Sequence, residues 1–159
     1  MNENKACIQK LYTGLQDLDA ETMMSCYHSE ATFQDPVFQL SSKEEIGAMW
    51  GMLCSGAREF ELDFEVLDAD ENRGRARVEA SYLFSITNRK VHNEIEAKFK
   101  FKDGLILRQR DDFRFYRWSR QAFGATGMLL GWMPFFQKQV QKRAYKNLKK
   151  FQSKSSLKK

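Results

Sequence analysis

Apolar side chains recur at helical spacing through the first third of the chain. Three stretches repeat the i, i+3, i+4, i+7 pattern of a helix that packs one face against a core. Their apolar stripes are Ile8, Leu11, Tyr12 and Leu15, then Ala20, Met23, Met24 and Tyr27, and then Ile46, Met49, Trp50 and Leu53. Asp19 is placed to cap the second helix, and Ser42 with Glu45 three residues later forms a capping box that opens the third.

The middle of the chain changes to a period of two, which is typical of β-strands with one face against a core. Four runs alternate apolar with charged side chains, at residues 59–66, 75–85, 94–101 and 107–115. The last run places Leu107, Gln109, Asp111, Phe113 and Phe115 on the apolar face. A turn near residues 70–72 and the Asp103-Gly104 pair indicate hairpins and an antiparallel sheet. Helices followed by such a meander predict an α+β domain of two layers.

A short strand ending at Asp35 lies between the second and third helices. Ala31, Phe33 and Asp35 share one side of that strand, and the first two mark this side as the interior. Pro36 has no N–H for a strand ladder, so the strand should stop where the carboxylate is presented. An inward acid costs stability unless it is used, which makes Asp35 the first candidate functional residue. The alternative is that it caps the backbone of a turn.

The C-terminal part of the chain differs in composition. Residues 122–136 contain no charge and three glycines, and Pro134 can open a basic amphipathic helix. Residues 134–159 carry nine Lys/Arg and no acid, whereas all 21 acidic residues lie at or before Asp112, so the net charge of +5 comes from this segment. We therefore expect a main domain over residues 1–118, a helical extension over 119–152 and a disordered tail over 153–159.

Three roles are open for the basic extension. It can dock on its own domain or on a dimer mate, which we favour. Residues 122–150 can instead contact a membrane surface, with Leu129, Leu130 and Trp132 in the interface and lysines behind. They should not span the bilayer, because the uncharged run of about 15 residues is shorter than the ~20 that a spanning helix needs. Nucleic acid is the least favoured partner, because no groove-reading motif accompanies the cations.

Composition limits the remaining possibilities. At 159 residues with 42% hydrophobic and 30% charged side chains, the chain suits one ordinary globular domain. The polar N-terminus lacks a secretory pattern, and Cys7, Cys26 and Cys54 have no ligand spacing, so we expect a cytoplasmic protein with reduced thiols.

His28 and His92 lie far apart, which predicts no metal site. The glycines after residue 122 lack the spacing and lysine of a phosphate loop and indicate close packing or a hinge.

Tyr12 in the first helix, Asp35-Pro36-Val37 after the first strand and the order of elements over residues 5–116 together resemble the nuclear transport factor 2-like superfamily. Within it the chain looks most like the SnoaL-like and ketosteroid-isomerase-like branch, and its ending from Tyr116 to Gly124 looks like that of one bacterial subgroup. The resemblance implies a cone, in which a curved mixed or antiparallel sheet wraps against three N-terminal helices around a pocket. It also implies that no cofactor is needed, and that a homodimer is common.

The resemblance also implies roles for individual residues. In ketosteroid isomerases the acid of the Asp-Pro-Val motif is the general base, which matches Asp35, and a helix-one tyrosine in the oxyanion hole matches Tyr12. The third partner, an aspartate two residues before a Phe-x-Phe pair, is replaced here by Ala97. Asp111 offers a substitute, since SnoaL-like cyclases and related hydrolases use inward polar residues on late strands. A core tyrosine at Tyr12 and a structural ion pair of Asp111 with Arg110 or Arg114 are the alternatives.

These observations predict a pocket for an apolar small molecule. Its catalytic residues would be Asp35, Tyr12 and Asp111. Its ligand-binding residues would be Phe33, Met49, Trp50, Gln109 and Phe113, although each aromatic side chain can equally belong to the core. Apolar surroundings should raise the pKa of Asp35. The function we favour is an acid–base isomerase, cyclase or hydrolase acting on a cyclic or polyketide-like substrate. The alternative is a non-catalytic carrier or interaction module with the same cone.

Overall fold

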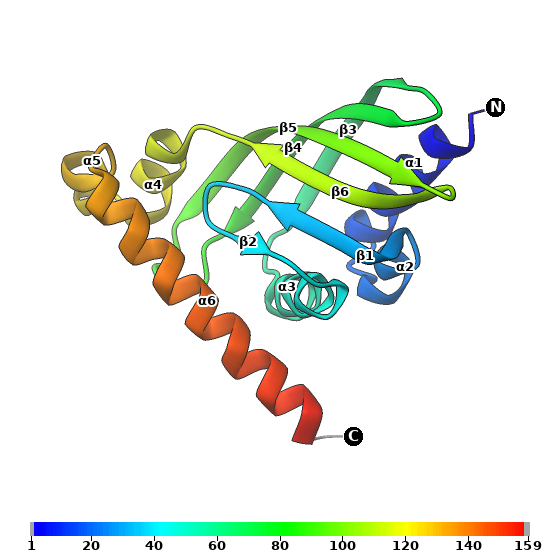
Figure 1. Ribbon diagram of the computed structural model, residues 1–159. Helices are drawn as coiled ribbons and strands as arrows, with labels where there is room; N and C mark the ends of the chain where they lie inside the picture. Colours follow the sequence, from blue (N-terminus) through cyan, green and yellow to red (C-terminus); the bar gives the residue numbers. More distant parts are fainter. Residues whose placement is uncertain (1, 158–159) are drawn as a thin grey trace.

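Three helices cover one face of a curved six-stranded sheet, and three more follow the last strand (Figure 1). The computed structural model of the protein describes residues 2–157, and the side chains as far as residue 154. The first three helices are α1 (Glu3–Gln16), α2 (Ala20–Met24) and α3 (Lys43–Gly56). The strands are β1 (Tyr27–Gln34), β2 (Gln39–Leu40), β3 (Glu61–Ala69), β4 (Arg73–Leu83), β5 (Lys90–Lys102) and β6 (Leu105–Asp112). The last helices are α4 (Phe115–Phe123), α5 (Ala125–Leu130) and α6 (Pro134–Leu157).

The sheet has the strand order β2-β1-β6-β5-β4-β3 and confirms the predicted α+β cone. Strands β3 to β6 form the expected antiparallel meander, but β1 runs parallel to β6, so the sheet is mixed. The period-two pattern is obeyed, because the apolar residues of β4 and β5 are buried and their charged neighbours are exposed. The inner face packs on α1 and α3 to form one continuous core.

Local signals in the sequence place several of the element boundaries correctly. The Asp19 carboxylate accepts a hydrogen bond from the Thr22 amide at 3.1 Å, and the Ser42 hydroxyl accepts one from the Glu45 amide at 3.2 Å. Asp103 and Gly104 both adopt positive φ angles, as a tight hairpin between β5 and β6 requires. The capping box is only half formed, because the Glu45 side chain accepts from the Ser41 amide instead.

Three expectations about strand positions were wrong. Tyr27 begins β1 and does not belong to the second helix, which ends at Met24. An irregularity in the pairing of β5 with β6 turns Ile106 inward, so Ile106 is fully buried and Leu107 only partly. Phe115 begins α4 and is not a strand residue, because β6 ends at Asp112, where its pairing with β5 also ends.

Helix α6 docks on the body of the protein along one face, as favoured from the sequence. Leu148 is fully buried, and the Phe151 ring lies against Gly51 of α3. Gln137 and Gln141 each donate a hydrogen bond of 3.0 Å to the carbonyl oxygen of Pro36. Figure 1 shows α6 running from α5 past α3.

The predicted boundaries of the extension differ from those of the helices. Helix α4 crosses the boundary placed between residues 118 and 119, and α6 continues to Leu157, so the predicted tail begins inside a helix. Residues 158–159 of that tail lie outside the described part of the chain. None of the described helices has both the length and the apolar character needed to cross a bilayer.

Candidate functional site

Asp35 lies in the turn between β1 and β2, half-buried beside the inner face of the sheet. Its Oδ1 accepts hydrogen bonds from the amides of Val37 at 2.7 Å and Phe38 at 2.6 Å, so the predicted capping role is present. Oδ2 accepts no hydrogen bond from the part of the chain that the structure describes. Burial raises the pKa of Asp35 to about 6, against the opposing effect of the two amides. The predicted upward shift therefore occurs even though Asp35 also caps the turn.

Asp111 is a second carboxyl group inside the cone. It is buried near the end of β6, and its Oδ1 accepts a hydrogen bond of 3.0 Å from the Gln109 amide nitrogen. Burial raises the pKa of Asp111 to about 7, and the charge of Asp35 adds to the shift. The two carboxyl groups are therefore close enough to influence each other. Among the described residues Asp111 forms no ion pair with Arg110 or Arg114, the predicted alternatives, and Arg110 pairs with Asp112 at 3.2 Å.

A chain of hydrogen bonds orients Gln109 toward Asp111. The Trp50 indole N–H donates to the Tyr27 hydroxyl at 3.0 Å, and that hydroxyl donates to the Gln109 Oε1. With Oε1 occupied, the Gln109 amide nitrogen faces Asp111 and donates to it. Tyr27 is thus a functional candidate that sequence reasoning missed by placing it in a helix. The available signal was parity, since Tyr27 precedes Ala31 by four residues and shares its side of the strand.

The hydroxyl group of Tyr12 is buried without a hydrogen-bond partner among the described residues. Its ring packs between Phe64 and Phe99, with centroid distances of 5.4 and 6.3 Å. Burial raises the pKa of Tyr12 well above its usual value, and the nearby charge of Asp111 raises it further. An unpaired buried hydroxyl is uncommon and costs stability. Tyr12 therefore offers a free donor close to Asp111.

Asp111 also stands directly opposite Ala97. Strand register pairs these two residues on β6 and β5, and both are buried on the inner face. Directly opposed residues of an antiparallel pair point to the same side of the sheet, with their Cβ atoms roughly 5 Å apart. Asp111 thus brings a carboxyl group from the neighbouring strand to the position at which the sequence lacks the third ketosteroid-isomerase residue.

The other predicted ligand-binding residues divide into two groups. Phe33, Met49 and Trp50 are nearly fully buried in the core, where Phe33 and Trp50 meet edge to face at 5.9 Å. Trp50 contributes through its hydrogen bond to Tyr27. Gln109 is fully buried and orients toward Asp111, whereas Phe113 lines the larger of two hollows described below.

The smaller hollow, of about 380 Å³, lies beside Asp35. Helix α6 covers it with Gln141, Lys142 and Tyr145, while the β1–β2 connection forms the opposite wall. From the other side α4 approaches the same region, because the Trp118 indole N–H donates to the Tyr82 hydroxyl at 2.9 Å. Burial raises the pKa of Tyr82 to about 12, with a contribution from the charge of Asp35. The helical extension therefore contributes one wall of the hollow beside Asp35 and bonds to Tyr82 nearby.

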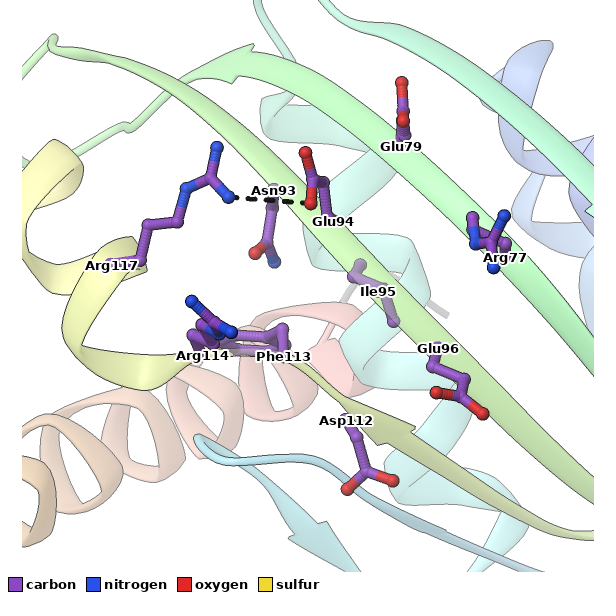
Figure 2. Close-up of a pocket in the computed structure, with 10 residues that line it drawn as sticks. All are labelled: Arg77, Glu79, Asn93, Glu94, Ile95, Glu96, Asp112, Phe113, Arg114 and Arg117. Carbon is purple, nitrogen blue, oxygen red and sulfur yellow. Dashed lines mark hydrogen bonds and ion pairs between the residues drawn. The ribbon is translucent and has the colours of Figure 1, made fainter.

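The larger hollow, of about 610 Å³, lies where β6 stops pairing with β5 (Figure 2). Side chains from both faces of the sheet line it, which indicates a slot between the strands. Asn93, Ile95 and Phe113 come from the inner face. Arg77, Glu79, Glu94, Glu96 and Asp112 come from the outer face, with Arg114 and Arg117 at the α4 side. Arg117 pairs with Glu94 across the slot at 3.5 Å, which Figure 2 marks with a dashed line.

One cluster on the outer face has the side chains of a metal site. The possible ligand atoms of Glu79, His92 and Glu94 lie within 4.8 Å of one another. The pairing of β4 with β5 brings them together, which the sequence analysis did not predict. All three side chains are exposed, and His92 and Glu94 already bond to Ser81 and Arg117. We assign no ligand to this cluster.

Comparisons with known proteins agree with the geometry. A family model described as the SnoaL-like domain matches residues 8–109. A candidate polyketide cyclase from Silicibacter sp. TM1040 superimposes with a TM-score of 0.65 at 19% identity, covering 74% of this chain and 93% of that chain. An LEH-like epoxide hydrolase from M. tuberculosis gives a TM-score of 0.61 at 15% identity, covering 80% and 92%. TerC, crystallised with polyporic acid, gives 0.64 at 14% identity, covering 77% and 100%. No curated protein matches the sequence. At these identities the structural similarity concerns the fold.

Proposed function

The chain belongs to the family of SnoaL-like domains, and from the acids inside its cone we propose that it catalyses proton transfer on an apolar small molecule. The observation that carries the proposal is the pair Asp35 and Asp111, two carboxyl groups whose pKa values burial raises to about 6 and about 7. General acid–base catalysis works best when the pKa lies near the operating pH. One member of this pair is then mainly ionised at neutral pH while the other still carries a proton much of the time.

In this proposal Asp35 is the general base. Its Oδ2 accepts no hydrogen bond from the described residues, and its lower pKa makes it the more ionised of the two acids at neutral pH. Asp35 would remove a proton from carbon next to a carbonyl group of the substrate. The amides of Val37 and Phe38 hold Oδ1, so the carboxylate is fixed in orientation before the substrate arrives, which avoids reorganisation during the reaction.

Tyr12 and protonated Asp111 would stabilise the enolate oxygen that forms. The Tyr12 hydroxyl has no other partner among the described residues, and Asp111 can donate from Oδ2 while Gln109 holds Oδ1. Two such donors in a buried site act where negative charge develops. The pairing of Asp111 with Ala97 supports this role, because it restores an acid on the face where ketosteroid isomerases carry one.

An apolar cyclic compound is the substrate class that we propose. Phe38 lines the smaller hollow and Phe113 the larger, while Phe33 and Phe99 lie in the core behind them. The two hollows, of about 380 and 610 Å³, have the size of small-molecule sites. The similarity to a candidate polyketide cyclase, and to a protein crystallised with polyporic acid, points in the same direction. Ligands would enter beside Asp35 or through the slot at Phe113.

Hydrogen–deuterium exchange tests the proposal directly. We would incubate 2-tetralone and other cyclic ketones with the protein in D2O and follow the protons next to the carbonyl by NMR. Asp35→Asn should lower the catalysed rate roughly 10²- to 10⁴-fold by removing the base. Tyr12→Phe should lower it roughly 10²-fold by removing a donor. Asp63→Asn, the same change on the exposed outer face, should have no effect.

Equal exchange rates with the wild-type protein and with Asp35→Asn across the ketones would contradict the proposal. If the ketones then still quench the tryptophan fluorescence of the protein, the protein binds them without reacting. That result would identify it as a carrier.

A further inference from the structure

Large apolar side chains gather on the surface where α5 leads into α6. Leu129, Trp132 and Phe135 are 70%, 69% and 65% exposed, more than any other large hydrophobic residue in the described part of the chain. With Met128 and Leu130 they form what we call the apolar tip (residues 128–135). Figure 1 shows α5 and the start of α6 at one extremity of the molecule. A contiguous exposed patch of this kind marks an interaction surface.

Glycines determine which side of this segment faces the protein. A Cβ atom added at Gly127 would overlap the carbonyl oxygen of Ser119, and one added at Gly131 would overlap the Ser119 hydroxyl. The segment therefore packs its glycine side tightly on α4 and turns its large apolar side chains outward. Tyr116 fixes the arrangement further by donating to the Met128 carbonyl at 3.0 Å. The apolar tip is thus held in place with its apolar side outward.

A row of lysines continues from the apolar tip along α6. Lys138, Lys142, Lys146 and Lys150 are all exposed and recur every four residues; we call them the basic stripe. Like charges four residues apart destabilise a helix. None of these four ammonium groups forms an ion pair with any of the residues that the structure describes. The basic stripe is therefore suited to an anionic partner outside the chain.

The charges of the whole molecule are also unevenly distributed between the body and the C-terminal extension. Residues 1–112 carry 14 Lys/Arg and 21 Asp/Glu, a net charge of −7, whereas residues 113–159 carry 12 Lys/Arg and no acid. An anionic surface would attract the extension and repel the body. This division would orient the molecule with the apolar tip toward that surface.

We propose that this end of the protein binds the surface of membranes that contain anionic lipids. The apolar tip would enter the boundary between headgroups and acyl chains, where tryptophan is favoured, and the basic stripe would lie over the headgroups. The Trp132 indole N–H already donates to the Leu129 carbonyl at 3.0 Å, so its insertion leaves no unpaired donor. Two extensions facing each other fit less well, because neither has an acid to oppose the cations of the other. Nucleic acid would use the basic stripe but not the apolar tip.

Vesicle flotation with the full-length protein tests the proposal. Vesicles of phosphatidylcholine with phosphatidylglycerol should bind the protein more tightly than phosphatidylcholine alone, and Trp132 emission should shift to shorter wavelength. The variant Leu129→Ser, Trp132→Ser, Phe135→Ser should weaken binding about tenfold for each side chain that no longer inserts. The variant Lys138→Gln, Lys146→Gln, Lys150→Gln should weaken it about fivefold for each charge and reduce its sensitivity to salt.

Leu18→Ser is the matched control, since Leu18 is 36% exposed but lies in the α1–α2 connection, on the opposite side of the molecule from α5 in Figure 1. It should bind vesicles as the wild type does, and all variants should unfold at similar temperatures because the changed side chains are exposed. Failure of the wild type to bind anionic vesicles would overturn the proposal. So would binding that the apolar-tip variant leaves unchanged, or a dimer that this variant dissociates in the absence of vesicle binding.

Discussion

Replacing Tyr12 by phenylalanine should make the folded protein more stable, although the hydroxyl group is a proposed donor in the site. The Tyr12 ring is 2% exposed, and its oxygen has no hydrogen-bond partner among the described residues. Folding therefore removes the hydroxyl from water and gives it no bond in return. An unpaired buried hydroxyl costs about 1–3 kcal/mol, so its removal should raise the free energy of unfolding by about 1 kcal/mol after some loss of packing.

Tyr27→Phe is a matched comparison with the opposite expected sign. Tyr27 is as deeply buried as Tyr12, at 1% exposed, and the same single oxygen is removed. Here the loss leaves the Trp50 indole N–H and the Gln109 Oε1 without their partner. At about 1–3 kcal/mol for each of the two groups left unpaired, Tyr27→Phe should lower the free energy of unfolding by about 2–6 kcal/mol.

Urea-induced unfolding, followed by far-ultraviolet circular dichroism, measures both effects. The two variants should share the m-value of the wild type, because each exposes the same surface on unfolding. Their midpoints should lie on opposite sides of the wild-type midpoint. If Tyr12→Phe lowers stability by 1 kcal/mol or more, on the scale set by a typical hydrogen bond, the hydroxyl is bonded in the folded protein. Tyr12 would then not be a free donor, and the proposed oxyanion site would lose one of its two members.

Two further predictions concern the acid pair and the extension. The pKa of Asp111 rises from 3.8 to about 7 on folding, so the folded state holds a proton that the unfolded state has lost; the free energy of unfolding should fall as pH rises from about 4 to about 7. Asp111→Asn should reduce that slope in urea titrations across this range, and an unchanged slope would show that Asp111 keeps an ordinary pKa. Gly127→Ala should destabilise the protein by several kcal/mol, roughly the scale of overpacking, because its Cβ would overlap the Ser119 carbonyl. Gly56→Ala is the control, because a Cβ atom added at Gly56 meets no atom within 4 Å, and it should leave the melting temperature unchanged or higher. A similar loss of stability in both variants would contradict the close packing of α5 on α4.

Several features of the fold follow from short stretches of sequence. The apolar stripes of α1 and α3, the cap at Ser42 and the positive-φ turn at Asp103 depend on interactions within a few residues, so a linear pattern is enough to predict them. The inward direction of Asp111 follows from strand parity in the same way. The alternation wrongly predicted that Leu107 faces inward, because an irregularity in the pairing of β5 with β6 shifts the register there. No local sequence pattern indicates this irregularity.

The candidate site depends on contacts that no local pattern specifies. Tyr27 reaches Gln109 across 82 positions of the chain, and Gln141 reaches Pro36 across 105. Asp111 meets Ala97 only because β5 and β6 adopt one register, and β1 joins β6 in parallel only because the meander brings the last strand beside the first.

The sequence by itself determined which residues face inward wherever strand pairing is regular, where helices begin and where an acid is placed next to a proline. Only the tertiary structure decided that Asp35 and Asp111 lie close enough to interact, that the Tyr12 hydroxyl has no hydrogen-bond partner among the described residues, and that α6 covers the hollow beside Asp35. The physical reason is that periodicity records whether a side chain is buried, whereas the identity of its neighbours depends on which distant surfaces the core brings into contact.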